Sequence, residues 1–288
     1  MQPPETAALR EFRPQVLDFL TQGPLPTLGK VTSQLCTASQ FDEPQYAQWC
    51  TELREEPAYR RKQWEFVFIC EALSQMGALR PGSRGLGFGV GKEPLPAVFA
   101  NRRCRILATD LDPSDAASAD WTGTNQHSSQ LSDLNERGIC PPEEFASLVQ
   151  FRAEDMNHIS PDLRDFDFTW SSCAFEHLGG IRHGLDFFVN SLCCLKPGGV
   201  AVHTTEFNLS SNFSTIEAHN LVIFRKFDIE GLASKVRAVG AELLPVNYNA
   251  GDRPIDRYYD IAPYSNTHLR MQLDRYVFTS IGLIAVKR

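Results

Sequence analysis

The sequence predicts a doubly wound α/β fold with a mostly parallel sheet of seven strands, an antiparallel pair of strands at one edge, and a helical appendage at the N-terminus. Three observations lead to this prediction. Strand-like and helix-like segments alternate between residues 84 and 204, which is typical of βαβ units and parallel sheets. A glycine-rich turn follows the first strand-like segment. The last two strand-like segments have no obvious helix between them.

The first 62 residues are expected to form a helical appendage or lid, ahead of a main domain at 63–288. Proline interrupts this segment repeatedly, and short helical stretches are predicted at 7–21 and 44–54. Three consecutive cations at 60–62 are interpreted as a solvated face, the usual role of so short a run.

The main domain is expected to begin with a helix, because apolar residues recur at spacings of three and four from Trp64 to Met76, before Gly77. The strands predicted after it are short runs bounded by turn residues. They cover 84–87, 105–109, 148–152, 166–171, 199–204, 241–246 and 276–286. Helices are predicted between them, notably at 93–101 and 184–195.

Composition narrows the functional class. Of 288 residues, 42% are hydrophobic and 22% are charged, as in an ordinary globular protein. The net charge of −7 argues against non-specific binding to nucleic acid or anionic membranes. We expect no membrane span, because no run approaches about 18 apolar residues, and no secretory signal in the opening MQPPETAALREF. The eight cysteines lack CxxC spacing, so we expect reduced thiols and a cytoplasmic protein.

Gly87, Gly89 and Gly91 form a glycine-rich turn between the first strand and a helix. Glycine removes the side chain where the backbone turns tightly and where a ligand comes close. The spacing differs from the dinucleotide fingerprint G-x-G-x-x-G, because Lys92 stands where Gly or Ala belongs. It also differs from a P-loop, because Glu93 follows Lys92 in place of Ser or Thr.

The second strand ends at Asp110, 19 residues after Gly91. A carboxylate at this position can accept hydrogen bonds from both hydroxyls of a ribose, and Leu111 could support an adenine ring. The alternative interpretation is a set of turn glycines beside a solvated aspartate. The combination of the loop with Asp110 favours a nucleoside-containing cofactor.

Several motifs in order resemble those of the class I S-adenosylmethionine-dependent methyltransferases, over about residues 65–288. They are Gly87-Phe88-Gly89-Val90-Gly91, Asp110-Leu111, Glu154-Asp155-Met156, Phe166-Asp167-Phe168-Thr169-Trp170-Ser171-Ser172, Phe175-Glu176-His177-Leu178 and Leu195-Lys196-Pro197-Gly198-Gly199. The resemblance implies a Rossmann-like fold that binds S-adenosylmethionine. The residues that it implies for the cofactor are Gly87, Phe88, Gly89, Gly91, Glu93, Asp110, Leu111, Asp155, Met156 and Ser171.

One position departs from the family pattern. The family usually has an acidic residue where Gly85 stands, and that residue helps to hold the methionine end of the cofactor. Glu93 is a possible substitute. Trp64-Glu65-Phe66, the segment 85–95, Trp170 to Leu178 and His203 to Asn208 resemble uncharacterised bacterial members associated with surface-glycan biosynthesis. This resemblance implies a small-molecule or glycan-precursor acceptor, for which O-methylation by in-line displacement is the expected reaction.

Candidates for the general base lie at strand ends, where an open parallel sheet gathers its functional groups. His177 follows the fourth strand, His203 ends the fifth, and Glu206 comes soon after it. His177 is preferred, because an unperturbed imidazole titrates near neutral pH. The alternative is that His177 only caps or packs the next turn. No His, Asp or Glu set has metal-ligand spacing, so no metal is predicted.

The long connection 247–275 is a candidate wall of the acceptor pocket, with a solvated connector as the alternative. Its polar and aromatic residues are Tyr248, Asn249, Arg253, Asp256, Arg257, Tyr258 and Tyr259. Two other functions stay open beside methyl transfer. A nicotinamide-dependent oxidoreductase shares the sheet and the acidic residue but needs another glycine spacing. A non-catalytic cofactor-binding protein would keep the fold without the chemistry. The acceptor atom and the oligomeric state are also left open.

Overall fold

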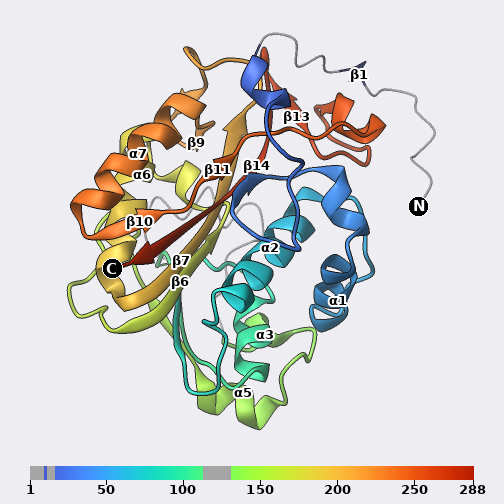
Figure 1. The fold of residues 1–288 in the computed structure, drawn as a ribbon. Helices are drawn as coiled ribbons and strands as arrows, with labels where there is room; N and C mark the ends of the chain where they lie inside the picture. The colour runs from blue at the N-terminus through green and yellow to red at the C-terminus, as the bar shows by residue number, and fades with distance from the viewer. Residues whose placement is uncertain (1–9, 12–16, 113–130) are drawn as a thin grey trace.

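A computed structural model describes residues 10–11, 17–112 and 131–288 of the chain (Figure 1). Its strands are β1 (Arg10–Glu11), β2 (Ser33–Leu35), β3 (Arg84–Gly87), β4 (Arg105–Asp110), β5 (Val149–Ala153), β6 (Phe166–Ser172), β7 (Leu195–Asn208), β8 (Glu217–Ala218), β9 (Leu221–Val222), β10 (Ala241–Leu243), β11 (Val246–Asn247), β12 (Tyr258–Ile261), β13 (Met271–Leu273) and β14 (Tyr276–Lys287). Its α-helices are α1 (Pro44–Glu52), α2 (Arg61–Gln75), α3 (Leu95–Asn101), α5 (Pro142–Leu148), α6 (Ile181–Ser191) and α7 (Lys226–Ala238). Its 3-10 helices are η1 (Asp18–Thr21), η2 (Ala38–Asp42), η3 (Leu131–Asn135), η4 (Phe175–His177), η5 (Leu192–Cys194) and η6 (Pro254–Arg257).

The central part of the sheet has the order β5-β4-β3-β6-β7-β14, with β10 paired to β14. Strands β3 to β7 run parallel, and β14 is antiparallel to both β7 and β10. The predicted parallel sheet is confirmed. The strand order reverses between β3 and β6, and in open α/β sheets ligands bind beyond the carboxyl ends of the strands at such a switch point. We call this side of β3 to β7 the carboxyl edge.

The predicted number of seven strands is wrong, because twelve of the described strands belong to one sheet. The strands of this sheet that the sequence did not indicate are β1, β2, β11, β12 and β13, each two to four residues long. Strand β2, for example, pairs with β14, and Gln34 lies opposite Gly282. So short a strand has no periodic pattern of its own and forms only because a distant segment supplies its hydrogen-bond partners.

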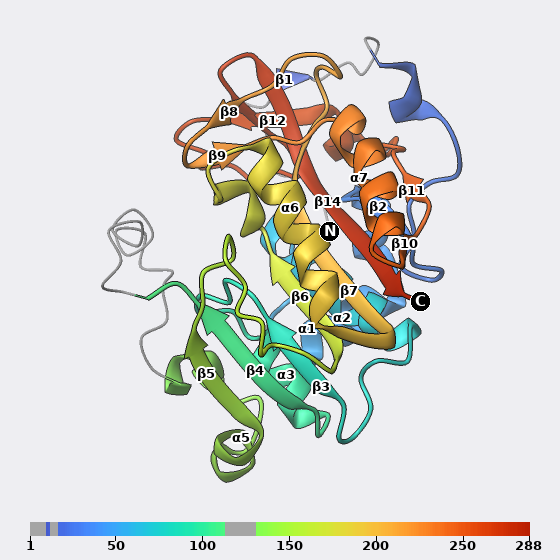
Figure 2. The same cartoon turned by 90° about the vertical axis from the view of Figure 1, so that its left-hand side faces the viewer.

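Helices cover both faces of the sheet: α6 and α7 lie on one face, and α1, α2 and α3 lie on the other (Figure 2). Alternation along the strands divides the core accordingly. In β7, Val200 and Val202 join the cluster that contains α2, whereas Ala201 between them joins the cluster that contains α6. In no helix of the described residues is there an apolar stretch long enough to cross a bilayer.

The segment from residue 17 to 60 lies against the main domain. Helix α1 packs on α2, and the ring of Trp49 donates its indole proton to Glu71 at 2.6 Å. Strand β2 joins the main sheet, so this segment contributes to the sheet as well as covering it. The predicted stretch 44–54 is helical as α1. Of the stretch 7–21, the structure describes β1 and η1; its remaining residues lie outside the described part.

Candidate active site

The glycine loop starts where β3 ends, at Gly87, and leads into α3. Gly89 and Gly91 have φ angles of +57° and +49°, which non-glycine residues rarely adopt. A Cβ atom on Gly87 would lie 2.3 Å from the Trp170 ring, and one on Gly89 would lie 2.9 Å from the Cβ of Ala174. The loop therefore needs glycine both for its conformation and for its close approach to β6.

Gly85, the position where the family has an acidic residue, is filled by a neighbouring ring. A Cβ atom there would lie 2.3 Å from Cζ of Phe168 in β6, so no larger side chain fits. The departure from the family pattern thus has a steric cause in this chain.

Asp110 ends β4 directly beside the glycine loop. Its Oδ2 accepts a hydrogen bond from the Gly91 amide at 3.0 Å, and its Oδ1 accepts one from the Leu111 amide at 2.9 Å. The residue is only 3% exposed. These two amides hold the carboxylate in one orientation beside the glycine loop.

Asp155 and Met156, the predicted adenine region, follow β5 on the same side. The Glu154 amide donates to the Asp110 carbonyl at 2.8 Å, which joins the ends of β4 and β5. A Cβ atom on Gly89 would lie 3.1 Å from Sδ of Met156. The thioether therefore lies against the glycine loop. Asp155 is more exposed and accepts a hydrogen bond from the His158 ring at 2.6 Å.

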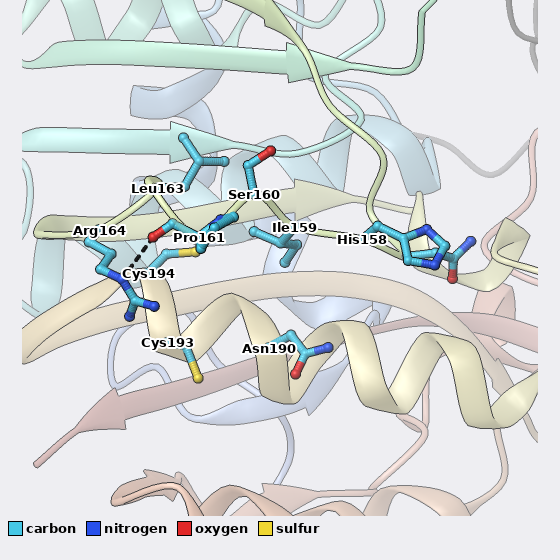
Figure 3. A pocket seen from close by; sticks show the side chains of 10 residues that line it. His158, Ile159, Ser160, Pro161, Leu163, Arg164, Asn190, Cys193 and Cys194 are labelled. Carbon is cyan, nitrogen blue, oxygen red and sulfur yellow. Dashed lines mark hydrogen bonds between the residues drawn. The ribbon is translucent and has the colours of Figure 1, made fainter.

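A cavity of about 310 Å³ lies beyond this region, between residues 157–164 and the end of α6 (Figure 3). His158 lies toward one end of it, and Cys193, an exposed thiol, lies toward the other with Arg164. Arg164 donates through Nε to the Pro161 carbonyl at 2.8 Å. The residues that line this cavity begin at Asn157, directly after Met156 of the predicted adenine region.

Two predicted cofactor residues have side chains that the structure turns elsewhere. The Phe88 ring is fully buried and packs edge-on against Phe187 of α6, with 5.2 Å between ring centroids. The Ser171 hydroxyl is also fully buried and hydrogen-bonds His203 at 2.8 Å. Both side chains point into the core. The prediction that they bind the cofactor is therefore corrected: only their backbone atoms can contact it.

His203 is likewise corrected as a general base, because its ring is enclosed under α6. The Ser191 hydroxyl donates to the Phe188 carbonyl at 2.7 Å, so the 3.1 Å contact with His203 needs a proton on Nε2. Nδ1 then accepts the Ser171 proton. Burial lowers the pKa of His203 to about 3. The ring is neutral, both nitrogens are used, and it has no exposed surface.

Glu93 lies in the loop before α3 and is buried. Its Oε1 accepts a hydrogen bond from the Trp170 indole at 2.6 Å. Burial raises the pKa of Glu93 to about 8, although the hydrogen bond from Trp170 opposes this shift. The carboxyl group is mostly protonated at neutral pH, so it differs from the ionised acid that the family pattern supplies.

The start of α2 reaches the ends of β6 and β7, which the sequence did not indicate. Lys62 donates to the Ser172 carbonyl at 3.1 Å, and Arg61 forms an ion pair with Glu206. Glu65, on the same helix, pairs with Lys62 at 2.8 Å and accepts the Ser280 hydroxyl proton at 2.6 Å. Burial raises the pKa of Glu65, but Lys62 and Arg61 hold it below its usual value. The interpretation of residues 60–62 as a solvated face is therefore wrong for Arg61.

His177 and Glu176 follow β6 in η4. His177 donates through Nδ1 to the Asn220 carbonyl at 2.6 Å, so the lone pair of the neutral ring is on Nε2, 4.0 Å from Oε1 of Glu176. Glu176 is buried and accepts the Thr205 hydroxyl proton at 3.0 Å. Burial raises the pKa of Glu176 to about 7, and His177 opposes this effect. The pair thus joins a half-exposed imidazole to a carboxyl group that titrates near neutral pH.

The ligand-type atoms of Cys173, Glu176 and Glu206 lie within 4.8 Å of one another. Such a set could hold a metal ion, but Glu206 already pairs with Arg61, which brings positive charge to the same place. The cluster therefore resembles a charge network more closely than an open metal site.

Three of the seven predicted acceptor residues in the connection 247–275 take part in hydrogen bonds that hold the connection in the fold. Asp256 is buried and accepts hydrogen bonds from the amides of Ala38 and Arg253. Asn249 donates to the Gly23 carbonyl at 3.1 Å. Another part of the connection, residues 265–268, lines a cavity together with residues 59–62.

No protein-family profile matches this chain, and no curated protein matches it. Several solved structures are distantly similar to this chain. An S-adenosylmethionine-dependent methyltransferase from Mesorhizobium loti has a TM-score of 0.47 at 12% identity, over 77% of this chain and 98% of that one. One from Clostridium acetobutylicum has a TM-score of 0.46 at 13% identity, over 84% and 97%.

A putative sarcosine dimethylglycine methyltransferase from Galdieria sulphuraria has a TM-score of 0.45 at 16% identity, over 68% of this chain and 65% of that one. A phosphoethanolamine N-methyltransferase from Haemonchus contortus, solved with S-adenosyl-L-methionine, has a TM-score of 0.41 at 19% identity, over 59% and 36%. This chain thus spans less than two thirds of the length of these last two. At such similarity, the function of this chain rests on its own residues.

Proposed function

We propose that the chain is an S-adenosylmethionine-dependent methyltransferase acting on a small-molecule acceptor, with O-methylation as the reaction. The observation that carries the proposal is the pairing of the glycine loop with Asp110, through the 3.0 Å hydrogen bond from the Gly91 amide. It leaves a side-chain-free turn next to an oriented carboxylate, at the switch point of the sheet.

The residues at the carboxyl edge fit this cofactor. Asp110 would accept hydrogen bonds from the two ribose hydroxyls, and Met156 and Leu111 would flank the adenine. Gly87, Gly89 and Gly91 would allow the methionine portion to approach the backbone. S-adenosylmethionine supplies a methyl group on a sulfonium sulfur, which an acceptor atom attacks in line. The tasks left to the protein are alignment, exclusion of water and removal of the acceptor proton.

His177 is the general base in this proposal. Its Nε2 carries the lone pair in the tautomer that the Asn220 carbonyl selects, and the residue lies in η4, which closely follows β6. Glu176 adjoins it as a carboxyl group of raised pKa. Glu206, the second candidate, is held by Arg61 and acts in this proposal as a charge partner. A sugar-type or glycan-precursor acceptor remains part of the proposal, supported by the narrower sequence resemblance.

The test is cofactor binding by calorimetry with S-adenosylhomocysteine and with NAD. Wild-type protein should bind the former and not the latter. Asp110→Ala should lose the two hydroxyl hydrogen bonds and weaken S-adenosylhomocysteine by about 2–4 kcal/mol. Asp110→Asn should weaken it less, because it keeps an acceptor for the Gly91 amide. Asp186→Asn, at a half-exposed site on α6, is the matched control. Binding of NAD instead would favour an oxidoreductase, and unaltered affinity in folded Asp110→Ala would refute the assignment.

A further inference from the structure

A cavity of about 420 Å³ lies between the start of α2 and the loop that joins β12 to β13. Residues 59–62 form one wall, and residues 265–268 form the other. The two walls come from segments about 200 residues apart in the chain that the fold brings together, and Figure 1 shows α2 running inward beneath the C-terminal strands. We call this space the α2 cavity.

The lining of the α2 cavity is cationic, although the protein as a whole carries −7. The described residues that line it include Arg60, Arg61 and Lys62 but no Asp or Glu. Arg61 and Lys62 pair with Glu206 and Glu65 behind the wall. On the facing wall, the buried Asp260 pairs with His268 and accepts hydrogen bonds from Asn266, so three carboxylates stand behind a lining with three cations.

Arg60 differs from the other two cations of the lining. Its side chain is exposed, and within the described part of the chain its guanidinium has no hydrogen-bond or ion-pair partner. Next to it, Arg61 is 13% exposed and its buried Nε has no hydrogen-bond partner among the described residues. Because that nitrogen is enclosed by the protein, the exposed Arg60, and not the Arg61 Nε, is the donor available to a ligand.

Helix α2 adds a further attraction for an anion. It begins at Arg61, and Arg60 in the N-cap position makes no capping hydrogen bond through its side chain. The first amides of a helix point outward, and the helix dipole adds about half a positive charge there. Ser265 and Thr267 on the facing wall provide hydroxyl donors.

Lys62 links the α2 cavity to the end of β6. Lys62 lines the cavity and also donates through Nζ to the carbonyl of Ser172, the last residue of β6. The glycine loop lies on the neighbouring strand, where the Phe88 amide donates to the Trp170 carbonyl at 2.9 Å. A molecule with one group in the cavity could therefore extend its other end over the end of β6.

We propose that the α2 cavity is the acceptor's anion subsite: it binds a singly charged oxyanion, a carboxylate or a phosphodiester, of the molecule that is methylated. The inference rests on the proposed function, because it names the substrate class of that site. A single charge fits better than a double one, because Arg60 is the one lining Arg or Lys without a carboxylate partner among the described residues. Arg60 and the first amides of α2 hold the oxyanion, and Lys62 marks the side that faces the methyl donor.

The experiment titrates acetate and dimethyl phosphate into protein saturated with S-adenosylhomocysteine, at constant ionic strength kept with chloride. Both anions should bind at millimolar concentration, and the tighter of the two identifies the acceptor group as carboxylate or phosphodiester. Arg60→Gln should weaken binding about tenfold or more, the loss of one charged hydrogen bond. Arg60→Lys should retain most of it. Arg237→Gln, which removes the same charge from the exposed end of α7, should change nothing.

Two results would overturn the inference. One is binding no stronger than that of chloride, and the other is an equal loss in Arg60→Gln and Arg237→Gln. The titration with S-adenosylhomocysteine comes first and separates the two proposals. If S-adenosylhomocysteine binds and the anions do not, only the anion subsite fails; if S-adenosylhomocysteine itself does not bind, both proposals fail.

Discussion

The guanidinium of Arg61 donates through Nη1 to Oε2 of Glu206, which joins the first residue of α2 to the far end of β7. The same nitrogen donates to the Ser280 hydroxyl of β14 at 3.1 Å. Burial lowers the pKa of Arg61, but Glu206 and Glu65 raise it by more. A charge pair that is almost completely buried thus fixes the start of α2 over the carboxyl edge.

Arg61→Leu should therefore destabilise the protein by about 3–5 kcal/mol, because Glu206 is left as a buried charge without its partner. Urea denaturation would measure the change. The double variant Arg61→Leu, Glu206→Leu should recover part of the loss, since it removes both charges. A cost below about 1 kcal/mol in the single variant, the usual range for exposed pairs, would contradict a buried pair.

His177→Gln should slow turnover by roughly 10²–10⁴-fold and leave the affinity for S-adenosylhomocysteine nearly intact, because only proton removal is lost. The deficit should shrink as pH rises if the acceptor hydroxyl ionises unaided. His183→Gln is the matched control, because His183 is an exposed histidine on the next helix. Normal turnover in His177→Gln at neutral pH would show that His177 only packs the η4 turn, and Glu206 would be tested next.

Glu93→Gln should stabilise the protein at neutral and alkaline pH. The pKa of Glu93 rises from an ordinary value near 4.5 to about 8. The native state therefore keeps a proton that the unfolded chain loses, and stability falls as pH rises from about 4.5 to about 8. Glutamine keeps an acceptor for the Trp170 indole and has no charge to bury.

The gain in Glu93→Gln should be small at pH 5 and on the order of 2–4 kcal/mol at pH 8, at about 1.4 kcal/mol per pKa unit. Thermal melting across this pH range measures it. A gain that does not depend on pH would contradict the raised pKa. If Glu93 also holds the methionine portion of the cofactor, the same variant should bind S-adenosylhomocysteine more weakly.

His203→Asn should reduce stability and leave catalysis per folded molecule almost unchanged. The variant would leave the Ser171 and Ser191 hydroxyls without their ring partner, at about 1–3 kcal/mol for each unsatisfied group. In the wild type, the pKa of His203 is lowered to about 3. Stability should therefore fall as pH drops from about 6.5 toward 3, because the unfolded chain binds the proton first.

Denaturation and steady-state kinetics on the same preparation separate the two effects in His203→Asn. If turnover slowed by about a hundredfold or more while stability stayed intact, the size expected for losing an acid–base group, His203 would be restored as a catalytic candidate. Wild-type stability that is flat as pH falls below the ordinary pKa of histidine would argue against a neutral, buried ring.

The parallel order of the strands, the glycine loop and Asp110 could be predicted from the sequence alone. These features depend on short-range relationships. Alternating segments require βαβ crossovers, a turn with positive φ requires glycine, and a strand that ends 19 residues after Gly91 returns beside the loop. At Gly85 the sequence showed only that the family's acidic residue is missing. The steric reason could not be predicted, because the Phe168 ring that excludes a side chain there comes from another strand.

The roles of the residues beyond those motifs depend on long-range packing, which the sequence does not show. Ser171 and His203 lie opposite each other in the register of β6 and β7, and the alternation of β7 gives His203 the face of Ala201. Helix α6 packs on this face and buries His203. The sequence does not show where a helix packs, so a histidine at a strand end is predicted to be an active-site residue. Arg61 and Lys62, which the sequence suggested were solvent-exposed, are part of the site because distant residues contact them. A run of cations carries no local signal of burial, and its partners Glu206 and Ser172 lie more than 100 residues away in the chain.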